Sequence, residues 1–355
     1  MFIFGLSNHY KILIMKALKY FLFLLLISVI GFCIYIAVQP NEFSFNRSKV
    51  IKAPTSMLYN KVNDYKNWPS FSPWIEQEPT ANLTYANKTV GIDGGYSWSG
   101  DILGEGSMKT LNVKENKLIE QHIQFIKPFE SESNIKWTFE PNEGGTKVTW
   151  AMSGKQDFMT KVMTTLKGSI EEMTAPYFER GLSKLDSIVS ADMKKYTINI
   201  NGETQHSGGF YIYNTASCKI SDIEATMEKT MPKITQYATN NNIQMAGPPF
   251  TYIHKWDEAN NAVIFSCCVP TISKVVTTQD DVLTGQLQAF KALKTTLKGN
   301  YSNLKEAWKT SMQHINNNSD LELEENGPML EVYLNNPKTT PNPANWMTEI
   351  YIAIK

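Results

Sequence analysis

The second half of the chain contains an internal repeat, and this repeat constrains the fold more than any other feature. Three asparagines precede a Gly-Pro dipeptide and a short strand-like run twice, at 240–253 and at 316–333. Each copy follows a segment with apolar residues at helical spacing, and each is followed by a second strand-like run, 262–269 or 348–354. Repeated units bury their apolar faces against one another. The sequence therefore predicts two strand-helix-strand-strand units that form one pseudo-symmetric α+β domain with a groove between them.

The second copy carries one carboxylate, Glu331, in the middle of its apolar strand. Because side chains alternate along a strand, Glu331 shares a face with Met329 and Tyr333. An ionised carboxylate in these surroundings needs a donor, a proton or a bound cation. In register, the first copy has Thr251 at the corresponding position. The alternative is an edge-strand glutamate that meets water or a lysine, and the strand alone does not decide between the two.

The Gly-Pro dipeptide, the strand with its central glutamate, the Asn-Asn-Pro turn and the final strand resemble the end of the GyrI-like effector-binding domain. The resemblance covers 195–355 and implies binding of bulky hydrophobic, often cationic, small molecules around such a glutamate. Aromatic rings hold a cation through their faces as well as through buried area, although each ring can equally fill the core. The candidate ligand-binding residues are Glu331, Tyr333, Tyr252, Trp308, Trp346 and Tyr351.

Between residues 41 and 194 the pattern is a strand, a helix, several strands and a long helix. A first strand ends at Pro54, and a helix with apolar residues as far as Trp68 ends at Pro69. Strand-like runs separated by turn residues follow at 96–102, 106–113, 117–125, 133–139 and 147–153. From Asp157 to about Met193 the spacing is helical, and Pro176 is expected to kink or interrupt the helix. The order predicts an antiparallel meander closed by a long helix.

This layout resembles the helix-grip fold of the SRPBCC, or polyketide-cyclase-like, superfamily, which is START-like. Words such as Asn67-Trp68-Pro69 and Gly145-Thr146-Lys147-Val148-Thr149-Trp150 are similar to the turns and core anchors of that superfamily. The resemblance implies an apolar cavity between a curved sheet and the closing helix. Trp98, Trp137, Trp150 and Phe178 are candidates to line this second cavity, and simple core packing is the alternative. The superfamily has no universal catalytic motif, so no catalytic residue is assigned.

The N-terminal segment, residues 1–40, contains a run that can cross a membrane. From Tyr20 to Val38 the chain carries no charge, and at about 1.5 Å per residue a helix over this run reaches about 28 Å. The apolar region is longer than that of a signal peptide, and no small-residue cleavage site follows it. The sequence predicts an uncleaved, single-pass transmembrane anchor. Either Met1 or Met15 can be the true start.

The charges near this run give a weak indication of orientation. Lys11, Lys16 and Lys19 precede the run, which favours an N-terminus inside and the bulk of the chain on the extracytoplasmic side. Basic residues just beyond the run nearly cancel this bias. The expected localisation is therefore a membrane, with the orientation weakly supported.

Composition and spacing argue against several function classes. The chain has 34 basic and 34 acidic residues, so no overall positive field attracts nucleic acid. The four cysteines and five histidines show no zinc, redox or triad spacing. No glycine-rich phosphate loop occurs. The sequence therefore implies no metal, no cofactor and no nucleic-acid partner.

These patterns together predict a membrane-anchored protein that binds or senses hydrophobic, including cationic, small molecules and is not favoured as an enzyme. Two alternatives stay open. GyrI-like relatives hydrolyse reactive ring-bearing natural products, and a desolvated Glu331 can act as the base in such a hydrolase. Alternatively, the chain is an interaction module that reports ligand occupancy to another membrane protein, whose identity the sequence does not give.

Overall fold

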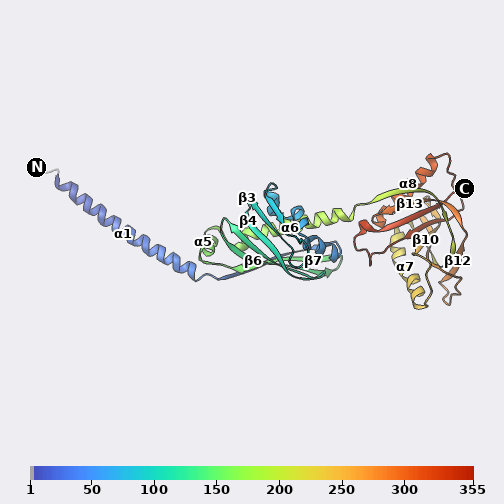
Figure 1. Ribbon diagram of the computed structural model, residues 1–355, viewed down its shortest axis with the longest axis horizontal. Helices are drawn as coiled ribbons and strands as arrows, with labels where there is room; N and C mark the ends of the chain where they lie inside the picture. The colour runs from blue at the N-terminus through green and yellow to red at the C-terminus, as the bar shows by residue number, and fades with distance from the viewer. Residues whose placement is uncertain (1–3) are drawn as a thin grey trace. The chain divides into compact units, whose positions relative to one another are not determined.

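A computed structural model describes residues 4–355, with side chains from Leu13 onward. Met1, one of the two alternative starts, and the side chain of Lys11 lie outside the described part. The contacts divide the chain into two compact units, Met1–Ile188 and Val189–Lys355 (Figure 1). The sequence boundary at 194/195 stays a prediction.

The first unit begins with one long apolar helix, α1 (Phe4–Ala37). Its segment Leu13–Ala37 is long and apolar enough to cross a membrane, with a mean hydropathy of 2.6. A signal sequence near an N-terminus passes the same test of length and composition. The helix could therefore span a membrane.

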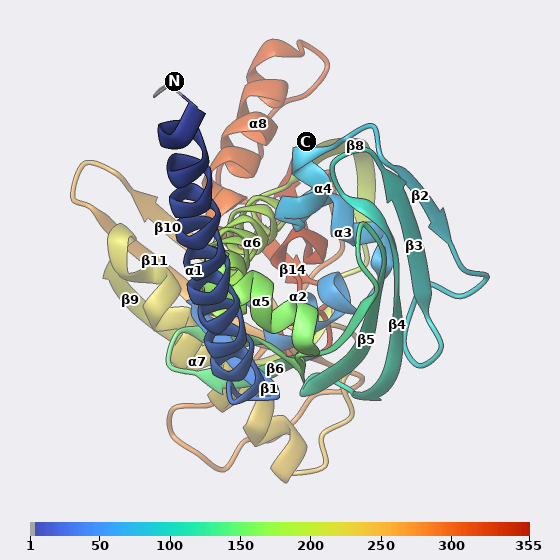
Figure 2. The same ribbon diagram turned by 90° about the vertical axis from the view of Figure 1, so that its left-hand side faces the viewer.

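The rest of the first unit is an antiparallel sheet that curves around a long helix. The sheet order is β1-β7-β6-β5-β4-β3-β2, and Figure 2 shows the curvature of β2 to β5. The strands are β1 (Glu42–Ile51), β2 (Asn82–Tyr85), β3 (Gly95–Gly100), β4 (Gly104–Lys114), β5 (Leu118–Lys127), β6 (Ser131–Asn142) and β7 (Gly145–Lys155). Between β1 and β2 lie α2 (Thr55–Asn63), α3 (Trp68–Phe71) and α4 (Pro73–Gln77). Each expected strand is present, and β2 is an addition.

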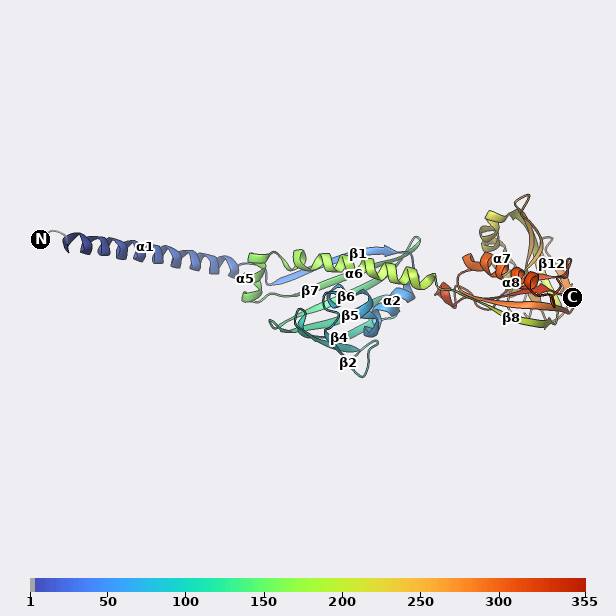
Figure 3. The same cartoon turned by 90° about the horizontal axis from the view of Figure 1, so that it is seen from above.

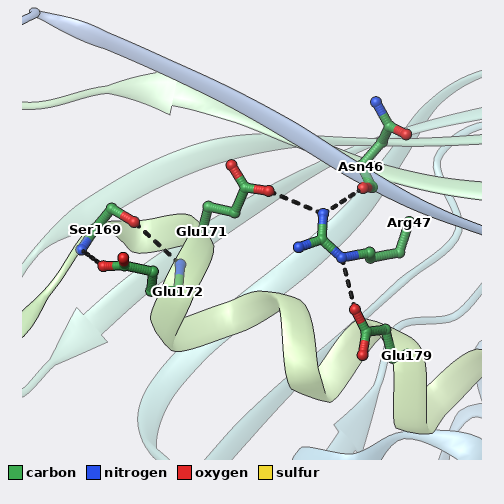
Figure 4. Close-up of polar contacts among 6 residues, drawn as sticks. All are labelled: Asn46, Arg47, Ser169, Glu171, Glu172 and Glu179. Carbon is green, nitrogen blue, oxygen red and sulfur yellow. Dashed lines mark hydrogen bonds and ion pairs between the residues drawn. The ribbon is translucent and has the colours of Figure 1, made fainter.

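The closing helix of this unit is interrupted at a glycine and not at Pro176, where a kink or an interruption was expected. The segment forms α5 (Phe158–Lys167) and α6 (Ile170–Met193), and α6 continues through Pro176. Gly168 between them has φ 103°, which side-chain-bearing residues rarely adopt. Ser169 and Glu172 then start α6 with a reciprocal capping box: the Ser169 amide donates to Glu172 Oε2 at 2.8 Å, and the Glu172 amide donates to Ser169 Oγ at 3.1 Å (Figure 4).

Arg47 on β1 fixes the first turns of α6 against the sheet. Its guanidinium donates to Glu171 at 2.9 Å and to Glu179 at 2.7 Å (Figure 4). These residues are partly exposed, so the pairs position the helix more than they stabilise it. The apolar stripe of α6, including Phe178, Leu182 and Leu185, is buried. Figure 3 shows α6 lying along this sheet.

The second unit consists of two strand-helix-strand-strand repeats with an additional strand beside each, which confirms the predicted α+β fold. The first repeat is β9 (Gly209–Lys219), α7 (Ile223–Asn240), β10 (Phe250–Asp257) and β11 (Ala262–Thr271). The second is β13 (Phe290–Lys298), α8 (Leu304–Asn317), β14 (Met329–Tyr333) and β15 (Met347–Ala353). The additional strands are β8 (Thr197–His206) and β12 (Leu283–Leu287), and the sheet order is β12-β9-β11-β10-β14-β15-β13-β8.

The two faces of this sheet differ in what covers them. The helices α7 and α8 bury two apolar clusters against one face, around Phe265 and around Ile350. A third cluster, around Leu330, lies on the other face and includes no residue of either helix. The two faces are called here the helix-covered face and the aromatic face.

Candidate functional site

Glu331 lies on the helix-covered face at the junction of the two repeats. It pairs with Thr251 on β10 and with Ile350 on β15. The residue is 5% exposed. The predicted strand and its central carboxylate are therefore present, and the carboxylate is enclosed.

Both oxygens of Glu331 accept a hydrogen bond from an aromatic residue of the predicted site. Trp308 Nε1 on α8 donates to Oε1 at 2.5 Å, and the Tyr333 hydroxyl donates to Oε2 at 2.7 Å. Burial raises the pKa of Glu331, and the two donors act in the opposite direction. The carboxyl group is thus held by the protein's own donors, so it needs no ligand cation for its hydrogen bonds.

Trp346 lies near this group through a further aromatic residue, Tyr301, which the sequence analysis did not single out. The Tyr301 ring is 4.6 Å from the Trp346 ring and 5.4 Å from the Tyr333 ring, between centroids. Burial, with the charge of Glu331, raises the pKa of Tyr301 to about 12. The structure therefore brings Glu331, Tyr333, Trp308 and Trp346 to one side of the sheet.

Tyr252 and Tyr351 lie on the aromatic face, so the expectation that they share one wall with Glu331 is corrected. Tyr252 pairs with Leu330, and Leu330 pairs with Tyr351. Because side chains alternate along each strand, these residues point away from the face of Glu331. Both tyrosines are half-buried and pack beside Phe250 and Leu330.

The aromatic face has a carboxylate of its own, Glu349, which the sequence analysis missed. Tyr351 donates its hydroxyl to Glu349 Oε2 at 2.7 Å, and Lys294 Nζ on β13 lies 2.7 Å from Oε1. The same ammonium group is 5.6 Å from the centroid of the Tyr351 ring. Glu349 lies two residues before Tyr351, so alternation placed it on the same face. Lys294 thus occupies the position that a ligand cation would take beside a carboxylate and a ring.

The first unit contains a cavity of 150 Å³ between the sheet and α6. Three of the four predicted residues line it: Trp98, Trp150 and Phe178. Trp137 is fully buried and stacks on Trp150 with centroids 4.2 Å apart, so it supports the wall from behind. The lining is almost entirely apolar and aromatic.

One polar atom of the cavity residues has no partner in the protein. Trp150 Nε1 is buried without a hydrogen bond. The neighbouring indoles differ, because Trp98 Nε1 donates to the Leu103 carbonyl at 3.3 Å and Trp137 Nε1 donates to Gln121 Oε1 at 3.2 Å. A buried donor without an acceptor costs free energy that a bound acceptor can recover. Among the side chains that the structure describes, from Leu13 to Lys355, no cluster of histidine, cysteine and carboxylate groups is arranged to hold a metal ion.

Two family models match the chain. Residues 51–181 match the model for polyketide cyclase / dehydrase and lipid transport, and residues 211–355 match the model for the GyrI-like small molecule binding domain. The chain carries these two domains in that order. The polyketide-cyclase-like domain contains the cavity, and the GyrI-like domain contains both Glu331 and Glu349. These families imply small-molecule binding.

Comparison with known proteins adds little beyond these models. No curated protein matches the chain. The C-terminal domain of EcmrR shares 17% identity, with 45% of this chain and 98% of that chain covered and a TM-score of 0.38. A protein from Mesorhizobium loti shares 16% (42% and 98% covered, TM-score 0.32), and Ara h 8.0201 shares 11% (41% and 99% covered, TM-score 0.30). These values carry no argument about function.

Proposed function

We propose that the GyrI-like domain captures or senses a hydrophobic small molecule on its aromatic face without chemical turnover, and that α1 anchors the chain in a membrane. The observation that carries this proposal is the half-buried Tyr351 bonded to Glu349, with the half-buried Tyr252 two strands away on the same face, which α7 and α8 leave uncovered. Half-exposed rings on one face with a charged group beside one of them combine apolar area with a polar point of orientation.

Glu331 is a weaker candidate for direct ligand contact. The residue is 5% exposed, so a ligand reaches its carboxylate only if the side chains that enclose it, such as Trp308 and Tyr333, move. The hydrolase alternative has the same requirement, because a general base must contact the water or substrate that it activates. No observation in the structure favours that alternative over binding.

The charge of the ligand depends on Lys294. While its ammonium group is bound to Glu349, a neutral aromatic ligand beside Tyr351 meets a charge pair and no free carboxylate. A cationic ligand must compete with Lys294 for the carboxylate and the Tyr351 ring. The proposed ligand is therefore primarily hydrophobic, and a cationic ligand binds only if it displaces Lys294 from Glu349.

The polyketide-cyclase-like domain supplies a second, smaller site in the same proposal. A cavity of 150 Å³ has room for a ligand of about one ring, since a dry apolar cavity of about that volume binds benzene in another protein. Trp150 Nε1 is unpartnered and has almost no accessible surface, so a ligand with an acceptor such as a carbonyl oxygen pairs with it once the cavity wall adjusts to expose this nitrogen. A water molecule held by this donor alone would lack the usual two to four partners.

The leading site is tested with two probes of equal shape, trimethylphenylammonium and tert-butylbenzene, whose binding to the full chain in nanodiscs is measured by ligand-observed NMR. Tyr351→Ala and Tyr252→Ala should each weaken both probes by roughly tenfold, because each ring supplies contact area. Trp308→Phe serves as the matched control on the helix-covered face and should change neither probe. Loss of binding in Trp308→Phe, with both tyrosine variants unaffected, would move the site to Glu331.

A further inference from the structure

Six exposed apolar side chains gather at one end of the polyketide-cyclase-like domain. They come from two turns and from α5, and they include Phe129 at 66% exposure, Met159 at 61% and Leu166 at 67%. We call this set the apolar rim. Its members are Ile102, Ile126, Phe129, Phe158, Met159 and Leu166.

The strand register places these segments at the same end of the sheet. The start of β1 pairs with the end of β7, through Glu42 and Lys155. The turn between β5 and β6 lies at this end as well, because Phe125 near the end of β5 pairs with Ser131 at the start of β6. Phe125 also pairs with Gly106 near the start of β4, so the turn between β3 and β4 lies at the same end. The helix α5 follows β7 directly. The three parts of the rim therefore lie at the end of the sheet at which the chain arrives from α1.

The helix α5 turns its apolar side outward and a lysine inward. Lys161 is buried and donates to Asn41 Oδ1 at 2.5 Å. Met159 and Leu166 lie on the opposite side of the helix from Lys161, Phe158 lies at its first residue, and all three are exposed. A surface helix of a soluble domain normally has the reverse arrangement. An outward apolar side indicates that something apolar covers it.

The turn that carries Ile102 is held in place by a buried carboxylate. Glu78 accepts from the backbone amides of Asp101, Ile102 and Leu103, at 2.7, 3.0 and 2.9 Å. These bonds lower the pKa of Glu78 and fix the turn while the Ile102 side chain stays exposed. The exposed isoleucine is thus presented by a positioned turn.

The linker from α1 is too short to let this end leave the membrane. The helix ends at Ala37 and β1 begins at Glu42, and four residues reach at most about 14 Å when fully extended. The linker is also fastened to the start of α5, because the Gln156 amide donates to the Asn41 carbonyl at 2.8 Å. Residues of α1 and α5 are in contact.

We propose that the apolar rim inserts into the interface of the bilayer that α1 spans, so that the polyketide-cyclase-like domain lies on the lipid surface. The inference rests on the proposed membrane anchor. Charges of both signs accompany the rim, such as the Glu105–Lys127 pair at 2.6 Å, so the contact depends on apolar insertion and needs no anionic lipid. Leu103 and Phe125 line the cavity and adjoin Ile102 and Ile126, which brings the cavity next to lipid.

The test uses the full chain in phosphatidylcholine vesicles that contain a phosphatidylcholine with a diazirine in its acyl chain. After irradiation, labelled peptides are identified by mass spectrometry. Peptides with Phe129 and with Phe158 and Met159 should carry at least about tenfold more label than the peptide with Val90 and Ile92, since an interfacial apolar side reaches the acyl boundary. Val90 and Ile92 are each 44% exposed and follow β2 at the opposite end of the sheet, so they are the matched control.

The variant Met159→Ser with Leu166→Ser should lose most of the label on α5, while Val90→Ser with Ile92→Ser should change nothing. Equal labelling of the rim and control peptides, with strong labelling of α1, would overturn the rim proposal and leave the anchor intact. Absence of label from α1 itself would overturn the anchor and the rim together.

Discussion

Thr251 and Glu331 face each other across the pairing of β10 with β14. They hold equivalent positions in the two repeats, so the pair lies where the repeats meet. The Tyr333 hydroxyl connects them, at 3.0 Å from Thr251 Oγ1 and 2.7 Å from Glu331 Oε2. The backbones of the two repeats are therefore equivalent here, but only the second repeat has an acidic side chain. Both hydrogen-bond donors to this acid also come from the second repeat.

Replacing Glu331 with glutamine should make the stability of the GyrI-like domain less dependent on pH. Because burial raises the folded-state pKa of Glu331, its contribution is fully present below the unfolded pKa and is lost as pH rises through the folded pKa. At pH 8 the Glu331→Gln chain should be more stable than wild type by about 1 kcal/mol or more, and this gain should shrink toward pH 4. Calorimetry of the detergent-solubilised chain measures it. A destabilisation at pH 8 that shrinks toward pH 4 would show instead that the charged carboxylate holds the fold.

Replacing Lys294 with methionine should favour cationic ligands. The change removes the ammonium group that now occupies Glu349 and the Tyr351 ring. Trimethylphenylammonium should bind about tenfold more tightly, and tert-butylbenzene should be unaffected. Combining Lys294→Met with Glu349→Gln should abolish this gain, because Glu349→Gln removes the negative charge that attracts the cation. An equal increase for both probes would indicate that the lysine acts as a steric barrier only.

Trp150→Phe should remove the preference of the cavity for acceptor-bearing ligands. Acetophenone and α-methylstyrene have the same shape, and only the ketone accepts a hydrogen bond. The wild-type chain should prefer acetophenone by roughly threefold to tenfold, the value of one hydrogen bond, as measured by ligand-observed NMR.

The matched control for this change is Trp98→Phe, because Trp98 lines the same cavity and its N–H already has a partner. This variant should keep the preference. Equal binding of the two probes to wild type would refute the role of Trp150 Nε1, whereas failure of both to bind would refute ligand binding in the cavity.

Limited proteolysis should separate the two domains. The helix α6 ends at Met193 and β8 begins at Thr197, so Lys194 and Lys195 lie in the short connection between them. Trypsin should cut there before it cuts elsewhere in either domain, because exposed connections are nicked first. Gel electrophoresis with mass spectrometry locates the cut. A first cut inside β1–β7 or β8–β15 would contradict the boundary.

Protease added outside intact cells should digest both domains if the N-terminus is inside. The expectation follows from the lysines that precede the uncharged run of α1, at positions 11, 16 and 19, and immunoblotting against each domain measures it. Protection of both domains in intact cells, with digestion after the membrane is opened, would place them in the cytoplasm.

The fold was predictable because its signals are local or repeated. Alternation, turn residues and helical spacing located most strands and helices of both units but not β2, β8 or β12. The Asn-Gly-Pro repeat located the two halves of the second unit. The end of α5 was missed because Pro176 is a stronger sequence signal than Gly168, yet the capping box of Ser169 and Glu172 starts the helix after the glycine. The helix then accommodates the proline.

The sequence by itself determined which residues share a face within each strand: Glu331 with Tyr333, and Glu349 with Tyr351. Only the tertiary structure decided how these sets combine, because the pairing of Thr251 with Glu331 joins strands far apart in the chain and sends Tyr252 to the opposite face. It also decided which face the helices cover. Coverage depends on long-range packing of α7 and α8. Glu331, at the centre of its strand, is therefore enclosed, whereas Glu349, beside Lys294, lies on the face that the helices leave uncovered.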